Sequence, residues 1–192
     1  MKKLSFIISV AIILSYGCTS KQSSSPEPGY GIIQNPSAEI TDGSVVKGWT
    51  FDPRSRNATH FYDNVAQEGT KSLFIKADRF STGRWTSKVL LKPWSKYRFT
   101  GWIKTENLVT QDGKGAGFRM DGLKVETQGL TGTNDWTQVS YEFETGNNDC
   151  ALIACVLDVE KMAKGRAWFD NMKMEYISSE KISTSPEMLM SG

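Results

Sequence analysis

Short stretches of alternating apolar and polar residues run through the middle of the chain, separated by turns rich in Gly, Asn, Asp and Pro. In residues 96–105 the apolar positions include Tyr97, Phe99 and Ile103, and residues 137–145 repeat this alternation. A period of two places one face of a strand against a core and the other against solvent. Further strands are predicted at 72–77, 86–91, 151–158 and 167–176. The pattern therefore predicts an all-β sandwich or barrel.

Two of these segments depart from simple alternation. Residues 151–158 are apolar at consecutive positions, which is typical of a central strand covered on both faces. In the last segment, Met172 and Met174 share one face and Phe169 has the opposite parity. If Phe169 also lies in the core, a β-bulge falls near Asp170.

The N-terminus reads as a targeting segment. Two lysines precede an apolar run over residues 4–14, and small residues lead to Gly17 and Cys18. This is the order of a secretory signal, and the run is too short to span a bilayer. Cys18 after Gly17 resembles the lipobox of bacterial lipoproteins, whose Cys is acylated. Ser15 and Tyr16 depart from the usual lipobox, so cleavage by an ordinary signal peptidase is the alternative.

The chain therefore divides into four predicted parts. Residues 1–17 form a signal peptide, 18–29 a lipid-anchored Ser/Pro-rich linker, 30–178 the folded domain and 179–192 a loose C-terminal tail. The predicted location is the cell envelope, at the outer membrane or cell surface. The protein is secreted instead if Cys18 is not acylated.

Composition narrows the classes of partner. The 192 residues suit one domain, and the 11% aromatic content is enough for one core. Without Lys2 and Lys3 the 23 basic residues become 21, equal to the 21 acidic residues. A near-neutral protein lacks the basic face that nucleic-acid binding needs, and it shows no polybasic membrane patch. It suits an uncharged ligand such as a neutral sugar.

The remaining cysteines do not form a disulfide or a metal site. Cys150 and Cys155 are five residues apart in one predicted strand, so their side chains point to opposite faces. Their Cα atoms would then be too far apart for a disulfide. With His60 as the only histidine, no Cys/His zinc site is possible.

Six motifs occur in order along the domain. They are Asn35-Pro36-Ser37-Ala38-Glu39, Gly48-Trp49, residues 69–75, residues 97–106, residues 132–137 and Ala167-Trp168-Phe169-Asp170-Asn171. As an ordered set they resemble the carbohydrate-binding module superfamily of families four and nine. The resemblance covers nearly the whole domain and implies a galactose-binding-like jelly roll, a β-sandwich of two antiparallel sheets. It also implies non-catalytic binding of a poly- or oligosaccharide, although fold alone does not fix the ligand.

The resemblance further implies a structural Ca²⁺ shared by the first and last strands. Its carboxylate ligands would be Glu39 and Asp170, with backbone carbonyls near Asn35, Ser37 and Lys71 as helpers. Calcium takes six to eight hard oxygen ligands, so this donor set is chemically suitable. The alternative is that Asp170 accepts hydrogen bonds from backbone amides at the bulge and that Glu39 is solvated.

Sugar recognition needs aromatic planes for C–H faces and polar groups for hydroxyls. The predicted contacts are Trp85, Phe80, Arg84, Trp102, Phe118, Arg119 and Asp121. Trp102 has the opposite parity from Tyr97, so it faces either the ligand cleft or the second layer. Trp49, Trp136 and Trp168 are expected to pack against the sandwich. Trp94, after Pro93 in a tight turn, is expected to be exposed or locally packed.

No catalytic pattern stands out. A Ser or Cys hydrolase needs a base, His60 is the single histidine, and no Gly-x-Ser-x-Gly motif is present. No carboxylate pair of a glycosidase is evident. Two other functions stay open: a surface adhesin or structural module that binds protein, and a polysaccharide lyase or hydrolase on a jelly roll. A co-encoded enzyme is a further candidate partner.

Overall fold

The computed structural model describes residues 29–53 and 57–179, which contain twelve β-strands and no helix. The strands are β1 (Thr41–Asp42), β2 (Val45–Val46), β3 (Thr50–Asp52), β4 (Ala58–Asp63), β5 (Ser72–Ser81), β6 (Arg84–Leu90), β7 (Ser95–Thr110), β8 (Gly117–Asp121), β9 (Val125–Glu126), β10 (Gly132–Glu144), β11 (Cys150–Val156) and β12 (Ala163–Ser179). Among these residues, nothing helical is long and apolar enough to cross a membrane. The predicted all-β class is confirmed.

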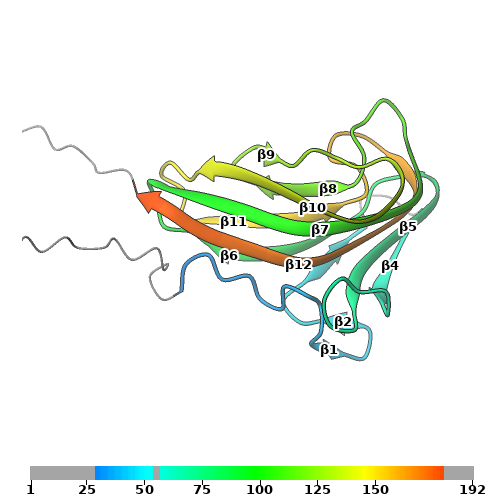
Figure 1. Ribbon diagram of the computed structural model, residues 1–192, viewed down its shortest axis with the longest axis horizontal. Helices are drawn as coiled ribbons and strands as arrows, with labels where there is room; N and C mark the ends of the chain where they lie inside the picture. The colour runs from blue at the N-terminus through cyan, green and yellow to red at the C-terminus, as the bar shows by residue number, and fades with distance from the viewer. Residues whose placement is uncertain (1–28, 54–56, 180–192) are drawn as a thin grey trace, which may run out of the picture.

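Two five-stranded antiparallel sheets form the layers of a sandwich (Figure 1). One has the order β10-β7-β12-β5-β4 and is called the β7 sheet; the other has the order β3-β6-β11-β8-β9 and is called the β11 sheet. Strands β1 and β2 form a separate small hairpin. The segment predicted to be a central strand is β11, which pairs with β6 on one side and β8 on the other.

The core lies between the two sheets and contains the residues that the alternation selected. Tyr97, Phe99 and Ile103 of β7 are fully buried. Phe99 meets Phe118 of β8 with ring centroids 5.0 Å apart, and Phe118 meets Phe169 of β12 at 5.5 Å. Contacts between large side chains from facing strands fix the spacing of the layers.

Strand β12 carries the predicted bulge. Its pairing with β7 shifts register between Asp170 and Lys173, and Asn171 has a φ of 45°. The shift turns both Phe169 and Met172 into the core, where they are 0% and 3% exposed. It also leaves the Asp170 side chain on the outer face of the sheet, opposite Trp102.

The described segment begins and ends at the same end of the sandwich (Figure 1). The Gly31 N–H donates to the Leu90 carbonyl at 2.7 Å, and Ser179 at the end of β12 pairs with Ser95 at the start of β7. The predicted signal peptide, Cys18 and the tail beyond Ser179 lie outside the described residues. Cys150 and Cys155 are free thiols, as predicted.

Candidate functional site

The outer face of the β11 sheet carries a grid of polar side chains over a small apolar floor. Because side chains alternate, Arg84 and Thr86 of β6 point outward, and they lie opposite Val156 and Ala154 of β11. On the other side of β11, Arg119 of β8 also lies opposite Ala154. Ala154 and Val156 form an apolar cluster with Val159, separate from the main core.

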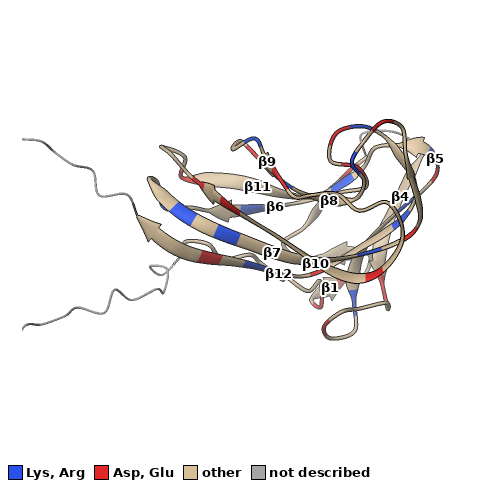
Figure 2. Ribbon diagram, turned by 45° about the horizontal axis from the view of Figure 1, so that its top comes forward, with Lys and Arg blue, Asp and Glu red and all other residues tan. Residues whose placement is uncertain are grey.

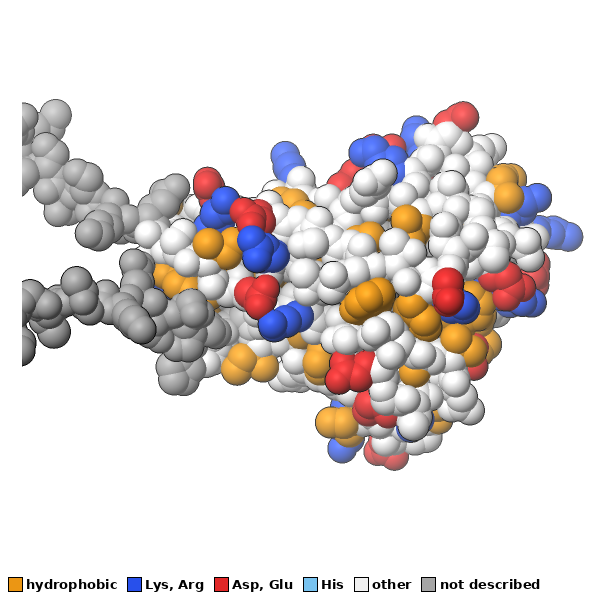
Figure 3. All heavy atoms as spheres, in the orientation of Figure 1, with side chains coloured by type: hydrophobic (Ala, Val, Ile, Leu, Met, Phe, Trp, Pro, Cys, Tyr) orange, Lys and Arg blue, Asp and Glu red, His pale blue; other side chains and the backbone are white. Residues whose placement is uncertain are grey.

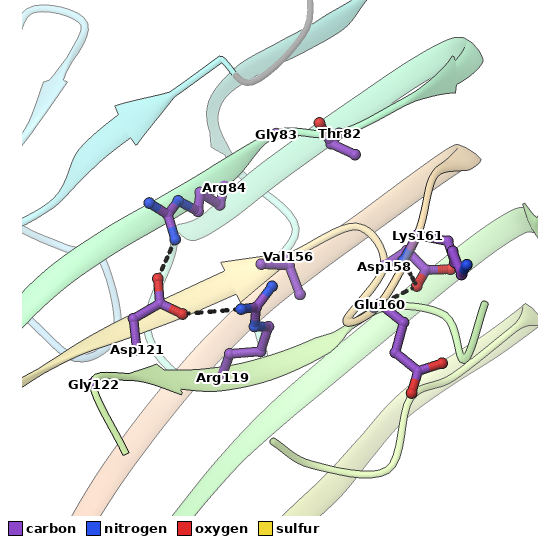
Figure 4. A pocket seen from close by; sticks show the side chains of 10 residues that line it. All are labelled: Thr82, Gly83, Arg84, Arg119, Asp121, Gly122, Val156, Asp158, Glu160 and Lys161. Carbon is purple, nitrogen blue, oxygen red and sulfur yellow. Dashed lines mark hydrogen bonds and ion pairs between the residues drawn. The ribbon is translucent and has the colours of Figure 1, made fainter. Parts of the chain in front are cut away.

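Two arginines converge on one carboxylate in this grid (Figure 4). Arg84 forms an ion pair with one oxygen of Asp121, and its Nε donates to Asp52 Oδ2 at 3.1 Å. Arg119 Nη2 lies 3.2 Å from the other oxygen of Asp121. The Arg84 side chain is 16% exposed and that of Arg119 is 41% exposed. Arg119 is thus the more accessible donor, and Arg84 is held on two sides.

A cavity of about 450 Å³ opens over these residues. It is lined by Thr82, Gly83, Arg84, Arg119, Asp121, Gly122, Val156, Asp158, Glu160 and Lys161. The Asp158 carboxylate accepts from the backbone N–H groups of Glu160 and Lys161 at 2.8 and 2.9 Å, which fixes the turn at one side of the cavity. A polar rim above an apolar floor is the usual construction of a small-ligand site.

A second hollow of about 590 Å³ continues along the same outer face. Its walls include Thr86, Lys88 and Leu90 of β6, Leu152 of β11 and the β1–β2 hairpin. None of the predicted sugar contacts lines this second hollow. The alternation of β6 was the available signal, because Thr86, Lys88 and Leu90 share the parity of Arg84.

The structure places two predicted sugar contacts in the core, and the prediction for them is wrong. Trp85 is 3% exposed and its indole N–H donates to the Phe74 carbonyl at 3.1 Å. Phe118 is 0% exposed. Trp85 follows the outward-pointing Arg84, and Phe118 precedes the outward-pointing Arg119. Because neighbouring side chains in a strand point to opposite faces, both rings point inward. Neither ring is available to stack on a ligand.

The other two predicted contacts do not line the cavity. Trp102 is on the outer face of the β7 sheet, opposite Gln138 and Asp170, on the other side of the sandwich from Arg84. Phe80 lies near the end of β5, with Lys164 Nζ 5.4 Å from its ring centroid. The structure therefore brings together only Arg84, Arg119 and Asp121 of the predicted set.

Glu39, near the start of the domain sequence, and Asp170, near its end, both contact the loop between β4 and β5. Glu39 accepts from the backbone N–H groups of Thr70 and Lys71, both at 2.8 Å, and from the Thr70 hydroxyl at 2.8 Å. Asp170 accepts from the backbone N–H groups of Gln67 and Glu68 at 2.7 and 3.0 Å. The two predicted carboxylates therefore bind the same loop, through residues 67–68 and 70–71.

Both carboxylates are perturbed by this setting. Burial, with a smaller contribution from the Glu39 charge, raises the pKa of Asp170 to about 6 against the opposing effect of the backbone N–H groups. Burial also acts to raise the pKa of Glu39, but the Thr70 and Lys71 N–H groups outweigh it and hold the pKa below its ordinary value.

The predicted helper residues have other contacts. The Asn35 side chain donates to the backbone carbonyls of Ile40 and Lys47 at 3.0 and 2.9 Å. The backbone carbonyl of Asn35 accepts from the Trp49 indole N–H. Lys71 contributes its N–H to Glu39, and Ser37 lies in the same loop as Asn35. Within 29–53 and 57–179, no three His, Cys, Asp or Glu side chains gather as a metal cluster. Carbonyls or water would have to complete any cation site.

Charges on the strands are mixed in sign (Figure 2). On the β7 sheet, Lys96 and Arg98 pair with Glu142, and Lys173 pairs with Glu175. This pairing of opposite charges agrees with the near-neutral composition.

Comparisons with solved structures identify the architecture. A family 61 carbohydrate-binding module, solved in complex with β-1,4-galactotriose, superposes with a TM-score of 0.55 at 13% identity, over 77% of this chain and 99% of that one. A family 4 carbohydrate-binding module gives a TM-score of 0.53 at 10% identity, over 76% and 100%. The protein has the fold of a carbohydrate-binding module. The predicted jelly roll is thereby confirmed.

The same carbohydrate-binding-module fold occurs in a catalytic protein. The enzymatically active domain of bacteriophage CBA120 tailspike protein 4 gives a TM-score of 0.55 at 13% identity, over 77% of this chain and 21% of that one. At such identities the likeness concerns fold alone. No protein-family model matches the chain.

A curated relative matches by sequence over part of the domain. The tRNA nuclease WapA of Bacillus subtilis strain 168 is 30% identical over 125 residues, which are 56% of this chain and 5% of WapA. The chain thus spans about one twentieth of the length of that relative.

Proposed function

We propose that the protein binds carbohydrate without cleaving it, on the outer face of the β11 sheet. The observation that carries the proposal is the cavity around Arg84, Arg119 and Asp121, in a fold shared with carbohydrate-binding modules. The guanidinium groups donate to sugar hydroxyls, and the carboxylates accept from them. Val156 lines the cavity between these polar groups but is itself only 5% exposed, so the polar groups carry the recognition.

The ion pairs prepare this site before the ligand arrives. Arg84 is fixed between Asp52 and Asp121, so little side-chain entropy is lost when a hydroxyl binds to it. Arg119 is 41% exposed, and its guanidinium has five N–H donors, so it can donate to a ligand while it is paired with Asp121. The second hollow, past Thr86 and Leu152, continues the face and accommodates further units of an oligosaccharide.

The carboxylates in the cavity support binding over hydrolysis. A glycosidase needs one carboxyl group as general acid and another as nucleophile or base. Asp121 is neutralised by two guanidinium groups, Asp158 is engaged by backbone N–H groups, and Glu160 is ion-paired to Lys114 at 2.7 Å. His60, the only histidine, stacks on Phe51 with ring centroids 3.7 Å apart and does not line the cavity.

The experiment compares two matched arginine variants. The secreted protein, carrying Cys18→Ser, is screened on a glycan array, and the best glycan is titrated by calorimetry. Arg119→Gln should weaken binding about tenfold or more, since a hydrogen bond from a charged donor is lost. Arg166→Gln is the control, because Arg166 is 42% exposed and ion-paired to Glu106 on the β7 sheet.

The outcomes separate the candidate functions. If Arg119→Gln and Arg166→Gln lower glycan affinity equally, or if neither changes it, the glycan site does not lie on the β11 sheet. No glycan binding by the folded protein would favour a protein partner. New reducing ends after incubation with the bound glycan would identify an enzyme.

We also propose that Glu39 and Asp170 supply the carboxylates of a structural Ca²⁺ site. Two carboxylates, one from the segment before β1 and one from β12, face the same loop, and carboxylates are the hard oxygen donors that Ca²⁺ prefers. A bound ion would join the loop before β5 to β12. The test is thermal unfolding with Ca²⁺ and with chelator: a Ca²⁺-dependent rise in Tm that Glu39→Gln abolishes supports the site, and an unchanged Tm refutes it.

We infer from the sequence that Cys18 is acylated and anchors the protein in the cell envelope. The support is the order of basic, apolar and small residues up to Gly17 and the Ser/Pro-rich linker after Cys18. Mass spectrometry of the N-terminal peptide tests this directly. A peptide that begins at an unmodified residue would make the protein a secreted one, with binding of glycan unaffected.

A further inference from the structure

Four large apolar side chains are exposed at the end of the sandwich where the described chain begins and ends. Ile32 is 58% exposed, Leu90 50%, Trp94 45% and Ile177 36%. Figure 3 shows hydrophobic side chains beside the two grey terminal traces. We call this surface the terminal end. Single exposed apolar residues are common, but a group around a tryptophan indicates an interaction surface.

The pairing of the strands places these residues at the same end of the sandwich. Ile32 follows Gly31, whose N–H donates to Leu90 at 2.7 Å. Trp94 precedes Ser95, which pairs with Ser179, and Ile177 lies two residues before Ser179. The four side chains therefore come from three segments that meet at one end of the sandwich.

The backbone at Trp94 supports this interpretation. Trp94 has a φ of 54°, a left-handed conformation that is unusual for a bulky residue, and its N–H donates to the Gly146 carbonyl at 2.5 Å. Such strain persists where the surroundings hold it and is concentrated at functional positions. Here the turn presents an indole outward from the end of the sheet.

We propose that the terminal end rests on the surface of a lipid bilayer. The proposal uses the inferred anchor at Cys18, because residues 18–28 reach at most about 40 Å when fully extended. This tether keeps the end that contains Gly31 close to the membrane. Tryptophan beside aliphatic side chains is the usual composition of a protein surface in the bilayer interface.

The charges nearby indicate apolar contact with lipid rather than attraction to anionic headgroups. Lys96 and Arg98 both pair with Glu142, and Lys173 pairs with Glu175 at 2.6 Å, so these cations behind the apolar residues are engaged by carboxylates. Contact should therefore depend little on salt or on anionic lipid.

This orientation directs the Arg84 cavity away from the membrane, whereas the second hollow, whose walls include Leu90, extends toward it. Strand β6 runs from Arg84 at the cavity to Leu90 at the terminal end. At about 3.3 Å per residue, the two positions are about 20 Å apart. A protein resting on Leu90 and Trp94 would hold the Arg84 cavity toward the surrounding medium.

The test uses a tether that does not require acylation. A hexahistidine tag in place of residues 1–18 attaches the chain to phosphatidylcholine vesicles that contain nickel-chelating lipid. Lipids with brominated acyl chains quench tryptophans that enter the interface. Quenching of the protein, lost for the most part in Trp94→Phe and kept in Trp102→Phe, is the expected result, since Trp102 lies on the β7 sheet.

Two results would overturn the proposal. Quenching that is absent, or equal in Trp94→Phe and the unsubstituted protein, would show that the terminal end does not contact lipid. Sedimentation of the Cys18→Ser protein provides the second measurement. A dimer that Leu90→Ser dissociates would assign the terminal end to a second copy of this chain.

Discussion

Arg84 of β6 and Asp121 of β8 form an ion pair across β11, the strand that lies between them. Arg119 reaches the same carboxylate from Asp121's own strand. The three side chains thus link the outer edges of the proposed glycan site over the small residue Ala154, which is 0% exposed. The ion pairs act mainly to hold donors in position, because partly exposed pairs add little to stability.

Asp121→Asn should therefore affect binding more than folding. The amide removes the charge that orients both arginines, and affinity for the glycan should fall by about tenfold. The free energy of unfolding should fall by no more than about 1 kcal/mol. Calorimetric titration and urea unfolding measure the two effects.

Asp135→Asn is the matched control for this carboxylate. Asp135 pairs with Lys104 at 2.6 Å on the β7 sheet, away from the cavity. Its substitution should leave affinity unchanged. A loss of affinity equal to that of Asp121→Asn would mean that general charge, rather than the cavity, determines binding.

Trp85→Ala should destabilise the protein rather than remove a ligand contact. The indole is buried, and it meets Phe51 and His60 with ring centroids 5.3 and 5.2 Å away. Removing a buried aromatic costs about 3–5 kcal/mol. Urea unfolding should show this loss, and Trp85→Phe should recover much of it with unchanged glycan affinity. Weakened binding by a stable Trp85→Phe protein would restore Trp85 as a ligand residue.

The sequence predicts six of the twelve described strands, β5, β6, β7, β10, β11 and β12, because their patterns are local. Alternation in β7 correctly selects Tyr97, Phe99 and Ile103 for the core, and consecutive apolar residues identify β11 as central. The bulge at Asp170 is also predicted, because Phe169 and Met172 have conflicting parity and both need burial. Each of these inferences uses neighbours within one segment.

The site was predicted only in part because its residues were chosen by type rather than by parity. Arg84 and Trp85 are adjacent in one strand, so they point to opposite faces and cannot contact one sugar. The same holds for Phe118 and Arg119. Applying alternation to β6 and β8 would have kept the arginines and rejected both rings. The hollow beside Leu152 needs the order of strands in the sheet, which local pattern does not provide.

Tyr141→Phe should stabilise the protein. Among the described residues, the buried Tyr141 hydroxyl has no hydrogen-bond partner, and burial raises its pKa well above the ordinary value. Removing an unsatisfied buried polar atom should raise the free energy of unfolding by about 1 kcal/mol. Chemical denaturation at one pH measures this gain.

Tyr97→Phe is the control, and it should lower the free energy of unfolding where Tyr141→Phe raises it. The Tyr97 hydroxyl is also buried, but it accepts from the Lys92 N–H at 3.0 Å. Its loss leaves that N–H without this acceptor and should cost about 1–3 kcal/mol. Equal effects of the two substitutions would show that the Tyr141 hydroxyl is satisfied in solution.

Stability should fall on acidification because of His60. Its ring stacks on Phe51 with planes 9° apart, and burial lowers the pKa of His60 below its ordinary value of 6.5. Between the lowered pKa of the folded state and the ordinary value of 6.5, His60 is protonated in more of the unfolded molecules than of the folded ones. The unfolded state therefore binds more protons in this pH range. Stability contributed by neutral His60 is therefore complete above pH 6.5 and decreases as the pH falls below it.

The His60→Phe variant isolates this effect. Phenylalanine keeps the stack on Phe51 and does not titrate, so the variant should lose less stability than the unsubstituted protein between about pH 7.5 and about pH 5. Groups that titrate in both proteins, such as Asp170, cancel in the comparison. Urea unfolding across this range provides the measurement. Parallel pH curves for the two proteins would mean that His60 has the same pKa folded and unfolded, and that the Phe51 stack does not exclude its charged form.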